Sequence, residues 1–215
     1  MNDTSKCCTK LHELFNSLKR FGFPFEEKEI PLNGIYVLFE KGELAHGAER
    51  IVRVGTHTGK NQLCSRLKQH FLMENKDRSI FRKNIGRAIL KKESDSFLKD
   101  WELDLTPAKA KSENLQRIDF EKQKKVEKKV SGCIQNNFTF AVFQVDSKEE
   151  RLGLEAKLIA AIAQCTECKP SSNWLGKQSP IEKISNGKLW LVQHLNAKAL
   201  EEKELEGLKQ KVKWT

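Results

Sequence analysis

The chain has 215 residues, of which 38% are hydrophobic and 32% are charged, and its 39 Lys or Arg residues outnumber 29 Asp or Glu residues. This length and composition predict one domain that folds without a disulfide or metal, and they argue against a membrane protein. The net charge of +10 favours a polyanion, above all nucleic acid, as the partner. The alternative is that the positive charge only keeps the surface soluble and binds no polyanion.

The N-terminal residues lack the apolar segment of a secretory signal, and no apolar run reaches the roughly 18 residues of a membrane span. We therefore expect a cytoplasmic protein with no membrane partner. Six irregularly spaced cysteines suit reduced thiols in a reducing compartment. Cys165 and Cys168 form the only C-x-x-C motif. A closed zinc site needs a second ligand pair, and no His or Cys spacing in the sequence provides one, so we expect no zinc site.

The first third of the chain predicts a helix and two strands. Apolar residues recur at helical spacing over residues 10–18. Residues 34–39, which include the only tyrosine, and residues 50–54 read as strands. The loop between them, with Gly42 and Gly47, is too long for a tight hairpin turn, but we still expect antiparallel pairing.

Two helices are predicted next. The helix over residues 61–74 has an apolar stripe with Arg66 and His70 one turn apart on its border, so both polar groups can face one site. The helix over residues 79–90 repeats the apolar period. Its other faces are basic, and three of their residues are candidates for phosphate or guanine contact: Arg82, Lys83 and Arg87. The later lysines are further candidates.

Positive charge concentrates between Lys76 and Val130, a segment with 16 Lys or Arg residues and 10 Asp or Glu residues. Residues 121–130 are nearly all polar. They are either a solvated helix face or mobile insertion, or a segment that contacts phosphates.

A third strand is predicted over residues 138–145, and Ser147 then opens a capping box that begins a helix. Glu155 falls within the apolar sector of this helix, where a carboxylate needs a partner. That sector comprises Leu152, Leu154, Leu158, Ile159, Ala161, Ile162 and Cys165. A loop anchored by Trp174, a short strand over 189–192 and a charged helix over 197–212 complete the chain.

Several motifs follow one another in a set order. They are Gly34-Ile35-Tyr36 on a strand, Arg53-Val54-Gly55-Thr56 ending the next strand, Arg66 and His70 on one helix, Glu155 on a later helix, and Asn173 beyond it. Their order and setting resemble the GIY-YIG nuclease family over about residues 32–175. Singly, each residue has an ordinary structural explanation, and the combination is what makes the resemblance specific.

The resemblance implies an α+β fold, with a small mixed or antiparallel three-stranded sheet flanked by helices. Residues 1–215 would form one nuclease domain, with an insertion at about 75–135 and an extension at 176–215. The implied activity is hydrolysis of a phosphodiester with one Mg²⁺ or Mn²⁺ ion held by Glu155. Tyr36 would be the general base, and Arg66 would brace the phosphate.

The resemblance defines the roles of the remaining family positions less narrowly. His70 would share proton transfer with Tyr36 or orient the phosphate, and Asn173 would order hydrogen bonds near the metal or phosphate. Arg53 departs from the family, whose second motif usually presents tyrosine. A guanidinium cannot be a base, but it can hold a phosphate or stabilise the ionised form of a neighbouring phenol.

Free-standing members with large insertions look like type II restriction endonucleases, which implies double-stranded DNA as substrate and a homodimer on DNA. A repair or mobile-element nuclease is the nearest rival. The other rival is a nucleic-acid-binding protein that kept the scaffold and lost catalysis, for which the arginine at position 53 is the sequence support.

Overall fold

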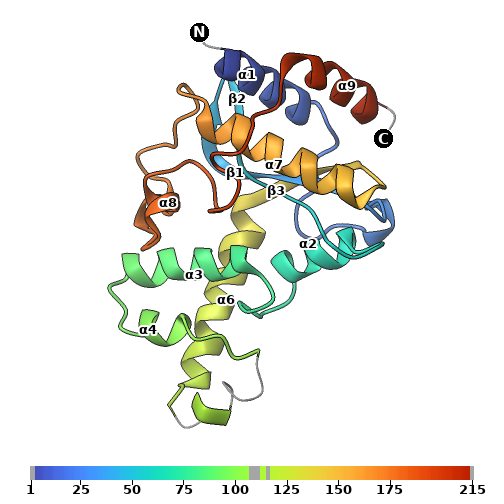
Figure 1. The fold of residues 1–215 in the computed structure, drawn as a ribbon. Coiled ribbons are helices and arrows are strands. Elements are labelled where there is room, and N and C mark those ends of the chain that lie inside the picture. The colour runs from blue at the N-terminus through green and yellow to red at the C-terminus, as the bar shows by residue number, and fades with distance from the viewer. Residues whose placement is uncertain (1–2, 107–111, 115–116, 214–215) are drawn as a thin grey trace.

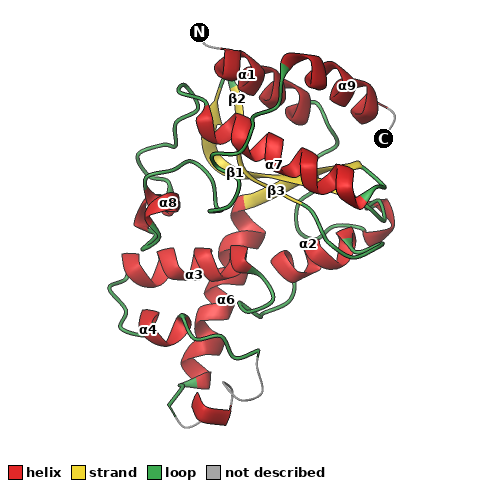
Figure 2. Cartoon of the chain, viewed as in Figure 1, coloured by secondary structure: helices red, strands yellow, loops and turns green. Residues whose placement is uncertain are grey.

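The computed structural model describes residues 3–106, 112–114 and 117–213, with helices on both sides of one sheet (Figure 1). The strands are β1 (Gly34–Ala45), β2 (Ala48–Gly55) and β3 (Phe138–Gln144). They lie in the order β2-β1-β3, and both pairs are antiparallel. The predicted α+β class, with a small three-stranded sheet flanked by helices, is confirmed (Figure 2).

Helical segments make up most of the rest of the described chain. The α-helices are α1 (Asp3–Asn16), α2 (Leu63–Phe71), α3 (Ile80–Lys92), α4 (Leu98–Trp101), α6 (Phe120–Asn137), α7 (Lys148–Gln164), α8 (Glu182–Ser185) and α9 (Glu202–Lys213). The short 3-10 segments are η1 (Glu27–Glu29) and η2 (Leu175–Gln178). No helix in the described ranges is both long and apolar enough to cross a bilayer.

The alternation of side chains along β1 divides the core into two clusters. Ile35, Val37 and Phe39 belong to a cluster with α1, α7 and α9. Tyr36 and Leu38 belong to the other, which contains apolar residues of α2, α3 and α6. In Figure 1 these two sets of helices lie on opposite sides of the sheet. The single tyrosine thus faces the side formed by α2, α3 and α6.

The connection between β1 and β2 is tighter than the sequence predicted. Both strands extend toward each other until Ala45 pairs with Ala48, which leaves a turn of His46 and Gly47. Both turn residues have positive φ values, 54° and 74°, as a type I′ hairpin turn requires. The prediction of a loop too long for a tight turn was wrong because residues 40–45, which include polar ones, continue the strand.

The insertion between α2 and β3 is helical, and α6 leads directly into β3. Val126, Val130 and Ile134 form the buried stripe of α6, while most of its lysines are exposed. Residues 121–130 therefore belong to a packed helix, on which most of the lysines face solvent.

Two local predictions differ from the structure. Leu152 was assigned to the buried sector of α7, but it is 36% exposed in the first turn of that helix. Residues 189–192 form no regular strand, although the backbone N–H of Trp190 donates to the carbonyl of Val52 at 2.8 Å. Trp190 is fully buried, so packing of the indole holds this segment against β2.

Glu40 on β1 is a buried carboxylate that accepts two indole hydrogen bonds. Its Oε2 lies 2.9 Å from Nε1 of Trp174 and 2.8 Å from Nε1 of Trp190. Burial raises the pKa of Glu40 to about 7, against the opposing effect of the two indoles. The folded protein therefore binds a proton at Glu40 more tightly than the unfolded chain does.

We expect Glu40→Gln to stabilise the fold more at pH 8 than at pH 5. Because the folded pKa is raised, the stability that Glu40 contributes falls as pH rises from about 4.5 to about 7. Glutamine does not ionise, so the variant avoids this loss of folding stability. The loss amounts to ~3 kcal/mol at ~1.4 kcal/mol per pKa unit. Urea unfolding at both pH values measures it, with the exposed Glu13→Gln as control. An equal effect of Glu40→Gln at both pH values would contradict the ionisation argument.

Candidate functional site

A buried hydrogen-bonded chain begins at the phenol of Tyr36. Its Oη is 2.7 Å from Nε2 of His70 on α2, and Nδ1 of His70 is 2.7 Å from Oγ of Ser79. Ser79 also caps α3 by accepting the backbone N–H of Arg82. Burial, followed by the charges of three nearby arginines, lowers the pKa of His70 well below its usual value, so the imidazole is neutral. These contacts link the phenol to one side chain that can accept a proton.

Gly55, at the end of β2, makes room for this phenol. Tyr36 and Gly55 are paired across β1 and β2, and a Cβ atom on Gly55 would lie 2.2 Å from Oη of Tyr36. Gly34 has a similar constraint, since its Cβ would lie 2.3 Å from the carbonyl oxygen of Phe143. The glycines of both motifs are therefore required by close packing.

Glu155 on α7 reaches the residue that follows Gly55. The backbone N–H of Thr56 donates to Oε1 of Glu155 at 3.1 Å, and Oγ1 of Thr56 donates to the carbonyl of Gly34 at 2.6 Å. Burial raises the pKa of Glu155, and the charge of Arg53 is the strongest opposing effect. The carboxylate of Glu155 and the phenol of Tyr36 thus contact adjacent residues at the end of β2.

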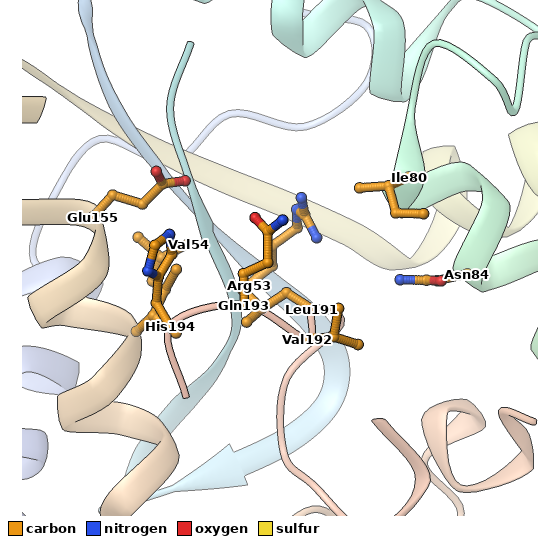
Figure 3. A pocket seen from close by; sticks show the side chains of 10 residues that line it. Arg53, Val54, Ile80, Asn84, Glu155, Leu191, Val192, Gln193 and His194 are labelled. Atoms are coloured by element: carbon orange, nitrogen blue, oxygen red, sulfur yellow. The ribbon is translucent and has the colours of Figure 1, made fainter. Parts of the chain in front are cut away.

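The carboxylate of Glu155 lines a cavity of about 190 Å³. Arg53 from β2 and Asn84 from α3 contribute to its wall, and Gln193 and His194 from the C-terminal segment add further polar groups (Figure 3). A carboxylate, a guanidinium and an imidazole around one cavity can together hold a metal ion and an anionic ligand.

Arg53 is largely buried beneath this cavity. Its Nη1 donates to the carbonyl of Trp190, and its guanidinium carbon is 5.4 Å from the centroid of the Phe81 ring. Its Nε is buried without a hydrogen-bond partner among the described residues. The guanidinium of this cavity-lining residue therefore keeps one buried donor that is unpaired among the described residues.

Arg66 lies on a second cavity, of about 350 Å³, whose lining includes Thr56, His57 and Gln69. Its Nη1 donates to Oε1 of Gln69 at 2.9 Å and to the carbonyl of Arg78 at 3.0 Å. Thr56 lines this cavity with its own atoms and binds Glu155 through its N–H. The hydrogen bond between Thr56 and Glu155 thus connects the cavity of Arg66 to the carboxylate that lines the first cavity.

Asn173 lies apart from these groups. It is exposed and does not line either cavity. Its neighbours anchor the loop to the far part of β1, since the backbone N–H of Ser171 donates to Glu43 at 3.0 Å and Trp174 binds Glu40. The role of Asn173 stays a prediction.

His194 is a candidate that the sequence analysis missed. Its imidazole projects into the cavity that Glu155 lines, and its backbone has a positive φ of 59° (Figure 3). The residue follows an apolar run near the C-terminus, where no motif marks it. Only the return of this segment over β2 brings it to the site.

The three basic residues predicted to contact DNA have structural partners. Arg82 has no exposed surface, and its guanidinium binds Oε2 of Glu127 at 2.7 and 3.1 Å, which does not agree with a DNA contact. Lys83 donates to the carbonyl of Glu102 at 2.8 Å, and Nε of Arg87 donates to the Glu102 carboxylate at 2.7 Å. A sequence pattern cannot separate such intramolecular pairs from free surface charges.

Comparison with family models gives one match, to the GIY-YIG domain, over residues 2–215. Comparison with curated proteins and with solved structures gives no match. The matched region includes the whole constellation of Tyr36, Arg66, His70 and Glu155 described above. The chain therefore belongs to the GIY-YIG domain family and is a nuclease, an enzyme that hydrolyses phosphodiester bonds.

Proposed function

We propose that this nuclease is a restriction endonuclease that cuts double-stranded DNA in one domain, with Tyr36, Arg66 and Glu155 as its central residues. The observation that supports this best is the contact of Tyr36 and Glu155 with adjacent residues, Gly55 and Thr56. A base and a metal-binding carboxylate at such close positions can act on the same phosphate.

Glu155 fits the role of a Mg²⁺ or Mn²⁺ ligand. Within the described ranges, the N–H of Thr56 is the only hydrogen-bond donor to its carboxylate, so Oε2 is available toward the cavity. Both ions prefer oxygen ligands, and one protein carboxylate leaves coordination positions for water and for phosphate oxygens. When bound, such an ion would stabilise the charge that develops on the phosphate.

Tyr36 and His70 would carry out the proton transfers, and Arg66 would bind the phosphate. Tyr36 takes a proton from the attacking water while its own phenol proton moves to Nε2 of His70, which lies 2.7 Å from the phenol oxygen. Arg66 holds the phosphate through its forked donors. Because Tyr36 has no exposed surface in the free protein, DNA binding must open a path for one water to its oxygen.

Arg53 replaces the tyrosine that the family usually presents there, and we propose that its role is electrostatic. In the described part of the chain its Nε has no partner. Its guanidinium lies near both His70 and Glu155, since its charge affects the pKa of each, after the larger effect of burial. A phosphate entering the cavity would supply an acceptor for this donor.

Digestion of plasmid DNA tests the proposed function. With Mg²⁺, the natural chain should give fragments of fixed length, and the same chain with excess chelator should give none. Cleavage at random positions would favour a repair or mobile-element nuclease. Binding without cleavage would favour an inactive scaffold.

A restriction enzyme that cuts a symmetric site needs two copies of this active site, so we propose a homodimer on DNA. Analytical ultracentrifugation with a duplex that contains the mapped site should give two chains per duplex. One chain per duplex at saturation would contradict the dimer.

The exposed lysines of α6 are the strongest remaining candidates for phosphate contact. Lys124, Lys125 and Lys128 are exposed, whereas Arg82 on the neighbouring helix is buried. We expect replacement of all three by alanine to weaken DNA binding and to lower the slope of log Kd against log salt by about 2 to 3, near one unit per phosphate contact. Fluorescence anisotropy over a salt series measures both quantities.

The matched control replaces Lys6, Lys198 and Lys203, which are also exposed but lie at the α1 and α9 end of the molecule (Figure 1). It changes the net charge equally. An equal change of slope in both triple variants would show that α6 has no special part in DNA binding.

A further inference from the structure

Three segments far apart in the sequence bring sulfur and nitrogen ligands to one point on the α1 side of the sheet. They are Cys8 on α1, His46 in the β1–β2 turn, and Cys165 with Cys168 after α7. The ligand atoms of Cys8, His46 and Cys165 all lie within 4.8 Å of one another, as do those of Cys8, His12 and Cys168. Both groups share Cys8, so the two sets of ligand atoms adjoin one another.

The C-x-x-C segment has the local geometry of a metal-binding turn. The backbone N–H of Cys168 donates to Sγ of Cys165 at 3.4 Å, which turns both sulfur atoms toward the same side. Sγ of Cys8 lies within 4.8 Å of Sγ of Cys168. Sγ of Cys8 thus lies near each of the other two sulfur atoms, and all six cysteines of the chain are free thiols.

His46 has one ring nitrogen available to this centre. Oγ1 of Thr9 donates to the carbonyl of Ser5 at 3.0 Å and lies 2.9 Å from Nδ1 of His46, so Nδ1–H is the donor in that second contact. The unprotonated Nε2 then faces Sγ of Cys165 at 3.5 Å. A partner that fixes the tautomer in this way is typical of a metal-binding histidine.

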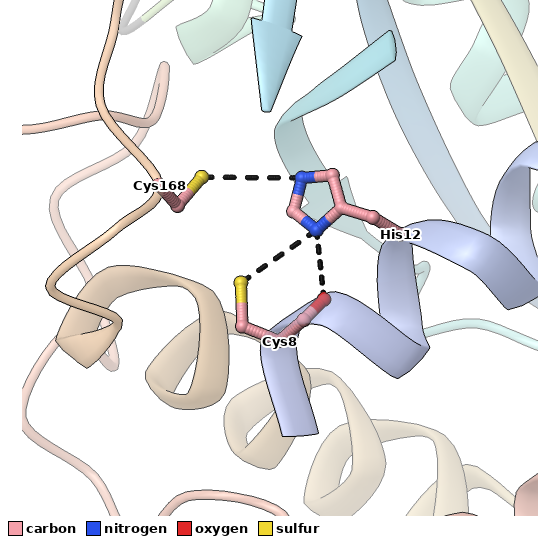
Figure 4. A group of neighbouring side chains, drawn as sticks. All are labelled: Cys8, His12 and Cys168. Carbon is pink, nitrogen blue, oxygen red and sulfur yellow. Dashed lines mark hydrogen bonds between the residues drawn. The ribbon is translucent and has the colours of Figure 1, made fainter. Parts of the chain in front are cut away.

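His12 lies beside the same sulfur atoms, but both of its nitrogens are engaged (Figure 4). Its Nδ1 is 2.9 Å from the carbonyl oxygen of Cys8, and its Nε2 accepts the backbone N–H of Ile51 at 3.2 Å. Its Nε2 is 3.9 Å from Sγ of Cys168. His12 therefore supports the cluster from outside, and His46 is the better fourth ligand.

We propose that Sγ of Cys8, Cys165 and Cys168 and Nε2 of His46 bind one structural zinc ion. Three thiolates from buried cysteines and one imidazole from the half-buried His46 match the ligand preference of Zn²⁺, and they differ from the oxygen ligands that Mg²⁺ prefers. The thiols release their protons on binding, and the buried guanidinium of Arg50 is near enough to the cluster to offset part of the resulting negative charge.

This site is distinct from the nuclease site. It joins α1, the hairpin turn and the end of α7 on one side of the sheet, while Tyr36 and His70 lie on the other. The sequence analysis missed it because the second ligand pair is Cys8 and a histidine 38 residues later, a spacing that resembles no zinc motif. The early helix and the hairpin become neighbours only in the fold.

Metal analysis of the natural protein, purified without chelator, is the first test. Elemental analysis should give about one zinc per chain, and X-ray absorption should give three sulfur ligands at about 2.3 Å and one nitrogen at about 2.0 Å. Zinc below about a tenth of an equivalent per chain, or a disulfide among these cysteines in the native protein, would overturn the site. Two sulfur and two nitrogen ligands would overturn the proposed ligand set.

Two variants separate zinc binding from general folding defects. His46→Asn removes Nε2 but retains a residue that tolerates the positive φ of 54°, so the hairpin turn is kept. We expect it to lose zinc at least tenfold more readily to a chromogenic chelator than the natural chain does. Cys133→Ser, a half-buried cysteine outside the cluster, should match the natural chain. Equal zinc retention in His46→Asn would overturn the role of His46.

Discussion

Replacement of Tyr36 by phenylalanine is expected to lower the rate of DNA cleavage by about 10³-fold, the size of a typical general-base contribution. The substitution removes one oxygen and its 2.7 Å hydrogen bond to His70, while the ring continues to fill the space above Gly55. DNA binding should stay near that of the natural chain. Single-turnover cleavage with saturating enzyme measures the chemical step, and anisotropy measures binding.

Ser79→Ala is the matched control for this variant. It removes the other hydrogen bond of His70, at Nδ1, but leaves the phenol in place. If Tyr36→Phe acted only by loosening His70, both variants would lose the same activity. Cleavage by Tyr36→Phe within threefold of the natural rate would exclude Tyr36 as the base.

Replacement of Glu155 by glutamine is expected to abolish cleavage, with a loss of at least about 10³-fold, because a neutral amide binds Mg²⁺ far more weakly than a carboxylate does. The glutamine carbonyl can still accept the N–H of Thr56, so the fold should be retained. Burial already raises the pKa of Glu155, and removal of its charge should not destabilise the protein. Cleavage rates over a Mg²⁺ and Mn²⁺ titration measure the effect.

Glu149→Gln on the exposed first turn of α7 is the matched control, since it removes one charge from the same helix. It should cleave as the natural chain does. If Glu155→Gln retained full activity at low Mg²⁺ concentration, the metal would have to bind elsewhere.

The strands and helices nearest the site were predictable because their signals are local. A β-branched and aromatic run predicted the strand of Tyr36, and the period of Leu63, Leu67 and Phe71 predicted the helix of Arg66 and His70. The need of Glu155 for a partner was also predictable from its place among apolar residues. Its partner, the backbone N–H of Thr56, was not, because no side chain marks it.

Features that depend on distant segments were not predictable. Arg82 was interpreted as a DNA contact because its partner, Glu127, is 45 residues away on α6. His194 joins the cavity of Glu155 only because the C-terminal segment crosses β2 at Trp190. The turn at His46 was missed because residues 40–45, which include several polar ones, did not resemble a strand. In the structure they continue β1, and Leu44 and Ala45 pair with β2.

The central claim is that Tyr36, which lies against Gly55, and Glu155, which binds Thr56, act on one phosphate. A crystal structure with cognate DNA and Mn²⁺ tests it most directly through the anomalous signal of the metal. We predict one manganese peak within about 2.2 Å of a Glu155 oxygen and of the scissile phosphate, with the Tyr36 oxygen directed at the attacking water. A phosphate bound away from Tyr36, or manganese without Glu155 as a ligand, would contradict the account.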